Sequence, residues 1–354
     1  MQLFEKLEIP IIQAPMLGAS TLEMALAVSR AGGLGSLAAG GLAPDALEAA
    51  VARLKAGTDR PFAVNLLMVE RASPSAREVE QALEALRPWY KAQELEVPAP
   101  PNDFALNYDD QFGALVRSAP SAASFAFSIL TRDQVTALHA QGTAVIGTAT
   151  TVAEAKAWAE VGADAICAQG SEAGGHRGHF LAPLEDSLVG TMALVATIRA
   201  AVNLPVIAAG GIMDGRGVAA ALALGAVAAQ MGTAFLLADQ TMVSAPWRRS
   251  IETAKDDPTR LTRAFTGRYA RGIENEFMRR MRPLEHAAPD YPVQNRLTQP
   301  LRAAAAARDD PQALSLWAGQ AVKLAAGGDA GALVEQWWSE AKDAAWALVK
   351  RTGG

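Results

Sequence analysis

The chain has 354 residues, of which 50% are hydrophobic and 19% charged, and its 32 Lys and Arg against 37 Asp and Glu leave a formal net charge of −5. This length suits one large α/β domain with additions, or two ordinary domains, and no basic stripe suggests nucleic acid as a partner. The single cysteine, Cys167, excludes an internal disulfide framework and a cysteine-based metal cluster. The longest nearly apolar stretch, 217–229, is too short to cross a bilayer, and the first residues lack the pattern of a signal peptide. We therefore expect a cytoplasmic protein, a monomer or a homodimer, that binds neither nucleic acid nor a membrane.

Short apolar runs alternate with helical patterns along the chain, which is typical of a parallel sheet wound by helices. The runs are continuous rather than alternating, as expected when helices and a packed interior cover both faces of the sheet. Eight strands close a TIM barrel, so the predicted fold is an α/β TIM (β/α)8 barrel; a doubly wound open sheet is the alternative. The predicted strands are 10–16, 34–39, 62–67, 123–129, 144–148, 165–169, 206–210 and 228–232, with helices such as 21–31, 45–56, 152–161 and 217–224 between them.

Two stretches interrupt this rhythm. Residues 69–118 exceed a normal strand-to-helix crossover in length, which indicates an insertion at the third unit. After residue 237 the alternation stops, and residues 238–310 have an Arg-rich, helical pattern. We therefore predict a barrel built from residues 1–68 and 119–237, an insertion at 69–118, a mostly helical lid or substrate domain at 238–310, and C-terminal helices at 311–354 that dock on the barrel.

Glycines follow the last two predicted strands, where TIM barrels commonly build a phosphate site. Gly210 and Gly211 let the backbone approach a ligand closely, and Gly232 with Thr233 adds further N–H groups and a hydroxyl. The alternative is that these glycines only permit tight turns. The run at 32–35 ends a helix and enters a strand, which is the wrong context for a dinucleotide fingerprint and argues against a Rossmann NAD enzyme.

The loop after the sixth predicted strand carries the most chemistry. Its sequence, QGSEAGGHRGH at 169–179, sets a Glu, two His and an Arg among four glycines. A histidine held over a barrel mouth is suited to general acid–base catalysis because its pKa lies near neutrality, which makes His176 or His179 the candidate. The alternative is that either histidine only bonds a loop carbonyl. No third His or paired carboxylate is spaced for a metal nearby, so no metal is predicted.

Seven segments together resemble the nitronate monooxygenases, formerly called 2-nitropropane dioxygenases. They are PIIQAPM at 10–16, FAVNL at 62–66, QGSEAGGHRG at 169–178, AAGGI at 208–212, AQMGTAF at 229–235, YPVQN at 291–295 and LWAGQ at 316–320. They occur in order along essentially the whole chain, and the Gly-Gly-His-Arg-Gly loop is similar to the class I branch. One departure is SFAFSIL at 124–130, where Ser128 stands in place of an expected glycine.

The resemblance implies an FMN-containing barrel with His176 as the catalytic base beside flavin N5. Tyr291 would line the substrate side, and Arg177 or lid arginines would attract a second negative charge on the substrate. Gln320 would approach the cofactor from a C-terminal helix. The residues expected at FMN, from the resemblance and the loop positions, are Ala14, Pro15, Met16, Asn65, Gln169, Gly174, Gly175, Gly210, Gly211, Gln230, Met231, Gly232, Thr233 and Gln320.

The implied reaction is the FMN-dependent oxidation of alkyl nitronates by O2 to nitrite and a carbonyl compound. A neutral nitroalkane would first lose a proton to His176, which as imidazolium would also help to hold the anion. Propionate 3-nitronate, which carries its own carboxylate, is one implied substrate. Two alternatives stay open: an FMN-dependent NAD(P)H reductase on the same scaffold, acting on an enoyl-acyl carrier protein or a quinone, and a non-redox barrel that binds a phosphorylated metabolite.

Overall fold

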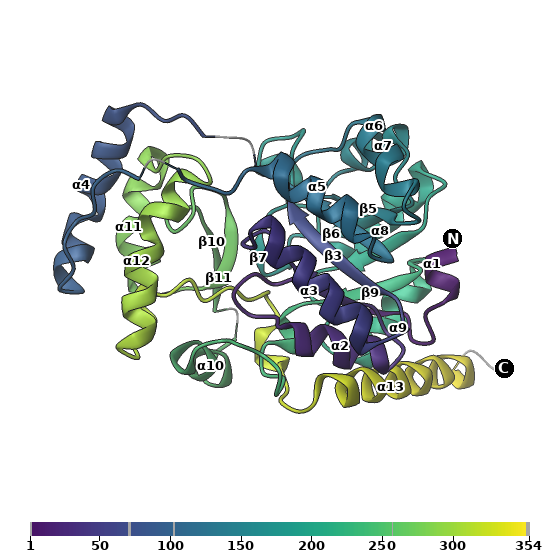
Figure 1. Cartoon of the computed structure of the whole chain (residues 1–354). Helices are drawn as coiled ribbons and strands as arrows, with labels where there is room; N and C mark the ends of the chain where they lie inside the picture. Colours follow the sequence, from purple (N-terminus) through teal and green to yellow (C-terminus); the bar gives the residue numbers. More distant parts are fainter. Residues whose placement is uncertain (1, 70–71, 102, 257, 352–354) are drawn as a thin grey trace.

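Eight parallel strands form a closed barrel (Figure 1). The computed structural model describes residues 2–69, 72–101, 103–256 and 258–351. Each strand pairs with its neighbours in chain order, the last pairs with the first, and a parallel bridge from Ile12 to Leu34 completes the ring. The strands are β1 (Ile11–Gln13), β2 (Gly35–Ala38), β3 (Phe62–Leu67), β4 (Ala122–Ala126), β5 (Ala144–Ala149), β6 (Ala165–Gln169), β8 (Val206–Ala209) and β9 (Ala228–Met231). This closure confirms the predicted TIM barrel and excludes the open doubly wound sheet.

Helices cover the outside of the barrel, and polar caps fix where several of them begin. The Thr21 and Thr151 side chains accept the N–H groups of Met24 and Glu154. Trp158 packs closely on β5, because a Cβ on Gly147 would lie 2.1 Å from its ring. The covering helices are α2 (Leu22–Arg30), α3 (Pro44–Gly57), α5 (Tyr108–Ser118), α6 (Arg132–His139), α7 (Val152–Val161), α8 (Thr191–Ala201), α9 (Gly215–Ala223) and α13 (Ala330–Arg351).

The barrel interior is a dry core that is closed at its N-terminal end. Small and branched side chains such as Ile12, Ala63 and Ile207 fill it. Helix α1 (Gln2–Glu5) and the residues after it place Phe4 and Leu7 against that core. Any large opening must therefore lie at the other end, where the strands finish.

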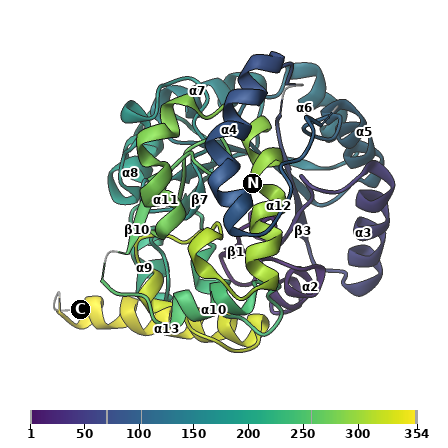
Figure 2. The same cartoon turned by 90° about the vertical axis from the view of Figure 1, so that its left-hand side faces the viewer.

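A second unit covers the open end of the barrel (Figures 1 and 2). Its core includes Phe265 stacked on Phe277 with ring centroids 4.3 Å apart, and Trp89 at 4.8 Å from Phe277. The Tyr90 hydroxyl donates to the Leu297 carbonyl at 2.6 Å, so helices far apart in sequence belong to one lid. Its elements are α4 (Ala76–Ala92), α10 (Ala245–Glu252), β10 (Thr259–Thr262), β11 (Ala270–Ile273), α11 (Glu276–Met281) and α12 (Val293–Ala307).

The structure divides the chain differently from the predicted segments in three places. The stretch 69–118 is split, because α4 joins the lid whereas α5 packs beside α3 with Leu115 in the barrel core. Besides the helices predicted for it, the lid contains β10 and β11, which form an antiparallel sheet with β7 (Gly175–His176). Of residues 311–351, only α13 is an α-helix, and it docks on α2 and α9.

Short 3-10 helices fill several connections: η1 (Glu185–Ser187), η2 (Thr233–Phe235), η3 (Arg282–Ala287), η4 (Pro311–Ala313) and η5 (Val322–Leu324). Between η4 and η5 the chain runs irregularly across the barrel mouth, so Trp317 belongs to a loop and not to the predicted helix. Within the described part of the chain, no helix combines the length and the apolar character that a membrane span requires.

Candidate functional site

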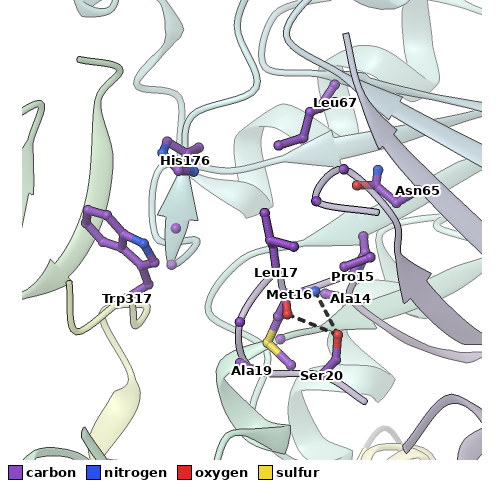
Figure 3. A pocket seen from close by; sticks show the side chains of 18 of the residues that line it. Ala14, Pro15, Met16, Leu17, Ala19, Ser20, Asn65, Leu67, His176 and Trp317 are labelled. Carbon is purple, nitrogen blue, oxygen red and sulfur yellow. Dashed lines mark hydrogen bonds between the residues drawn. The ribbon is translucent and has the colours of Figure 1, made fainter. Parts of the chain in front are cut away.

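A cavity of about 1150 Å³ lies between the barrel mouth and the lid. It is lined by the residues that follow the barrel strands, by the lid helix α12 and by the loop that carries Trp317. In Figure 3, His176 and Trp317 form one wall, and the segment from Ala14 to Met16 lies across the cavity from them. The cavity is larger than most small-molecule pockets, so it has room for a cofactor together with a substrate.

Glycines after β8 and β9 form a cradle at one end of the cavity. Gly210 and Gly211 have φ values of +119° and +72°, in the left-handed region that favours glycine. Among the described residues, no protein acceptor takes the N–H groups of Gly211, Gly232 or Thr233. The Thr233 hydroxyl accepts the N–H of Gly319 at 2.9 Å, which leaves its hydrogen for another acceptor. Such converging donors fit a phosphate group.

The acidic side chain of Glu172 lies beside Gly211, and its carboxylate is hydrogen-bonded to the start of a helix. Glu172 accepts the N–H of Thr191 at 2.9 Å and the Thr191 hydroxyl at 2.8 Å. It thereby satisfies the start of α8, whose N-cap residue, Gly190, has no side chain to do so. Its carboxylate is therefore held at the start of α8 by these hydrogen bonds.

Gln169 holds the loop that carries His176. Its amide donates to the His176 carbonyl at 3.0 Å and accepts the N–H of Gly178 at 2.8 Å. The short strand β7 then pairs His176 with Ala270 of the lid. Gln169 lines the cavity as predicted, but its polar atoms position this loop.

Arg177 lies away from the cavity, contrary to its predicted role at the substrate. Its side chain is buried, and its guanidinium donates to the main-chain carbonyls of Gly170, Gln169 and Ser187 at 2.6, 3.0 and 2.9 Å. Successive residues of a strand point to opposite faces, so a cavity-facing His176 turns Arg177 inward. The Arg177 guanidinium therefore stabilises the loop after β6 through these hydrogen bonds.

His176 sits among three aromatic rings. Its ring centroid lies 5.6 Å from Phe127, 5.7 Å from Tyr291 and 5.6 Å from Trp317. Its Nε2 lies 2.9 Å from the hydroxyl of Thr266 in the lid. Because burial and two nearby arginines lower its pKa to about 3, the ring is neutral near pH 7, as a base that has yet to take a proton must be.

The other loop histidine is not placed for catalysis. His179 does not line the cavity, and its Nδ1 is buried without a hydrogen-bond partner among the described residues. Burial and the charge of Arg268 lower its pKa to about 4. Of the two candidates named by the sequence, the structure brings only His176 to the cavity wall.

Arg302 brings a positive charge to this wall from helix α12. One of its terminal nitrogens donates to the carbonyl and to the side-chain oxygen of Asn295, at 2.9 and 2.8 Å, and its Nε is buried without a partner in the described structure. Burial lowers its pKa to about 10, still well above neutrality, and only Tyr291 acts in the opposite direction. Arg302 is half-buried, and none of the described carboxylates forms an ion pair with it, so its charge favours an anionic ligand.

Phe127 also belongs to the site and was missed by the sequence analysis. It has φ of +85°, which is strained for a residue with a side chain and is typical of functional sites. Its ring packs edge-on against His176 and Tyr291, and the guanidinium of Arg268 lies over it at 4.2 Å. The sequence signal that could have pointed to Phe127 is its neighbour Ser128, which stands where the family resemblance leads one to expect a glycine.

Most of the other predicted residues line the cavity. They are Ala14, Pro15, Met16, Asn65, Gly174, Gly175, Gln230 and Tyr291. The side-chain nitrogen of Asn65 donates hydrogen bonds to Ser124, which leaves its side-chain oxygen as an acceptor. Met231 is instead buried in the barrel core, and Gln320 is exposed while its flanking residues face the cavity. In the described residues, no group of three His, Cys, Asp or Glu side chains is arranged to hold a metal ion.

Comparisons with known proteins agree over nearly the full length. A family model described as nitronate monooxygenase matches residues 1–340. A Staphylococcus saprophyticus protein named "Probable nitronate monooxygenase" is 42% identical over 328 residues, 92% of each chain. A Staphylococcus aureus (strain Newman) protein of the same name is 41% identical over 320 residues, 90% of each chain.

Two solved structures share the fold. Nitroalkane oxidase from Streptomyces ansochromogenes matches with a TM-score of 0.91 and 41% identity, covering 98% of this chain and 100% of that one. FabK from Thermotoga maritima matches with a TM-score of 0.76 and 30% identity, covering 99% and 98%.

Proposed function

Since this chain belongs to the nitronate monooxygenase family of oxidoreductases, we propose that it oxidises alkyl nitronates with FMN and O2 to nitrite and a carbonyl compound. The observation that carries this proposal is the pairing, in one cavity, of an anion cradle with a neutral histidine near the half-buried Arg302. The cradle suits the phosphate of a flavin mononucleotide, and the opposite wall suits an anionic nitronate.

FMN fits the residues present. The free N–H groups of Gly211, Gly232 and Thr233 would hold its phosphate. The segment from Ala14 to Met16 would flank the ring system, and the free oxygen of Asn65 would accept a hydrogen from it. When bound, FMN supplies the redox chemistry, and the protein supplies orientation and electrostatics.

His176 has the properties of a base that works inside a dry site. Because it is neutral, its free ring nitrogen can take the carbon-bound proton of a nitroalkane, leaving the electron pair on the substrate as a nitronate. The low pKa alone would make it a weak base. The new negative charge of the nitronate would stabilise the imidazolium, and the Arg302 cation would stabilise the nitronate. A preformed nitronate needs no such step.

We assign to Arg302, and not to Arg177, the binding of a second negative charge on the substrate. In propionate 3-nitronate this second charge is a carboxylate, and the half-buried Arg302 guanidinium, which has no counterion among the described residues, suits it. Neutral nitroalkanes and simple alkyl nitronates remain within the same proposal.

The cofactor is expected to be FMN and not FAD. The cradle offers donors for one phosphate, and the barrel has no dinucleotide fingerprint. Mass analysis of the flavin released from the purified, heat-denatured protein measures this directly. FAD as the bound species, or no flavin at all, would contradict the assignment, and the latter would favour the non-redox alternative.

Anaerobic mixing distinguishes the oxidase from a reductase on the same scaffold. We expect ethylnitronate to bleach the flavin absorbance rapidly, whereas NADH and NADPH at equal concentration leave it largely oxidised. On admission of oxygen, nitrite should form with the ethylnitronate sample. Rapid bleaching by a nicotinamide, with no response to ethylnitronate, would establish the reductase instead.

A further inference from the structure

One lid threonine, Thr266, lies within hydrogen-bond distance of the ring of His176. Thr266 is buried and lies in the turn between β10 and β11, within the cavity wall. Its hydroxyl oxygen lies 3.0 Å from the carbonyl of Arg268 and 2.9 Å from Nε2 of His176. The N–H of Arg268 approaches the same oxygen at 3.5 Å.

A hydroxyl has a single hydrogen to donate, and a carbonyl can only accept. The Thr266 hydrogen is therefore directed to the Arg268 carbonyl, and its lone pairs face the Arg268 N–H and the histidine. The contact at 2.9 Å is then a hydrogen bond only if Nε2 of His176 carries a hydrogen and donates it.

If Thr266 donated its hydrogen to His176 instead, fewer polar groups would have hydrogen-bond partners. If Thr266 donated to Nε2, the hydrogen of the neutral ring would sit on Nδ1, which has no acceptor among the described residues. The Arg268 carbonyl would also lose its hydroxyl donor. Nδ1 is not among the buried polar atoms that lack partners, so it is open to the cavity that His176 lines.

We propose that Thr266 is a positioning residue that holds His176 in the Nε2–H tautomer, so that Nδ1 is the atom that accepts the substrate proton. The proposal rests on the proposed function, because it assigns an atom to the proton transfer. In that step the substrate C–H bond breaks, an N–H bond forms at Nδ1, and the electron pair remains on the nitronate. The resulting imidazolium keeps its Nε2–H bond to Thr266, so no group has to turn.

The direct test is nitrogen-15 NMR of the flavin-loaded enzyme labelled at histidine. The chain has four histidines, and comparison with His176→Asn identifies the signals of His176. We expect a protonated Nε2 and an unprotonated Nδ1 in the resting enzyme. A protonated Nδ1 would overturn the proposal whatever the enzyme's activity, and this reading stays valid if nitronate oxidation itself is not observed.

The kinetic test compares Thr266→Val with Thr266→Ser at matched flavin content. Val has the same shape without the hydroxyl, and we expect kcat with nitroethane to fall about 10- to 100-fold, the range for outer groups that orient a histidine. Oxidation of preformed ethylnitronate should change much less, and Ser should restore nitroethane turnover to within a few-fold of wild type.

Thr143→Val is the matched control, because Thr143 is equally buried and donates to the Pro120 carbonyl at 2.8 Å, but lies at the closed end of the barrel. It should leave both activities unchanged. Equal losses on both substrates in Thr266→Val, or no loss on either, would overturn the proposal. If the Val variant does not fold, the NMR spectrum of the wild type decides alone.

Discussion

Replacing Gly232 with Asp is expected to give a folded protein that retains almost no flavin. The backbone of Gly232 has φ of −112°, which any residue adopts, so the change introduces no backbone strain. A Cβ there would lie 3.4 Å from the Ala14 side chain and 3.6 Å from the Met16 sulfur, which are ordinary contacts. The protein alone therefore tolerates the substitution.

The same substitution places a carboxylate among donors that we assign to the phosphate. A negative charge about 4 Å from the phosphate costs several kcal/mol at an effective dielectric constant of 20. The new carboxylate also competes for the free N–H groups of Gly211 and Thr233. Flavin-to-protein absorbance after purification, and titration of the apoprotein with FMN, measure the loss.

Two further variants separate charge from bulk. Gly232→Ala adds only the Cβ and should retain much of its flavin. Gly113→Asp adds the same charge on helix α5, beside Arg117 and away from the cavity, and should retain wild-type flavin content. A folded Gly232→Asp protein with full flavin occupancy would place the phosphate elsewhere.

The barrel was predictable because its strands are buried on both faces. The predicted strands at 62–67 and 165–169 coincide with β3 and β6, since apolar runs of that length are typical of buried parallel strands. The first predicted strand, 10–16, shrinks to Ile11–Gln13 because residues 14–16 leave the sheet and line the cavity. Strand ends are therefore where prediction from sequence loses precision, and they are also where this site lies.

The lid sheet was not predictable, because it exists only through contacts distant in sequence. Strand β7 has two residues in a glycine-rich loop and pairs with β11, which lies in a stretch read as helical. Without that pairing, no pattern shows that Thr266 faces His176 across 90 positions of the chain. Long-range pairing of this kind overrides local propensity.

The roles of Arg302 and Arg177 were also not predictable from the sequence, because they depend on the fold. The sequence analysis named Arg177 or lid arginines for a second substrate charge, but Arg177 follows His176 directly, and neighbouring strand residues face opposite sides. Arg302 is one of 32 basic residues, and its sequence context on α12 resembles a solvated helix face. Only the fold shows that it is half-buried near Tyr291 and that no described carboxylate pairs with it.

Replacing His176 with Asn is expected to separate two activities of the enzyme. A neutral nitroalkane must lose a carbon-bound proton, and removing a positioned base typically costs about 100- to 10,000-fold in rate. A preformed nitronate has already lost that proton, so its oxidation should fall much less. Oxygen uptake with nitroethane and with ethylnitronate, at matched flavin content, gives the two losses.

His179→Asn is the matched control, because this histidine lies in the same loop but does not line the cavity. It should leave the ratio of the two activities unchanged, even if the loop becomes less stable. Equal losses on both substrates in the His176 variant would show that His176 stabilises the anion and does not take the proton. No loss on either substrate would show that His176 only packs in the cavity wall, together with Phe127, Tyr291 and Trp317.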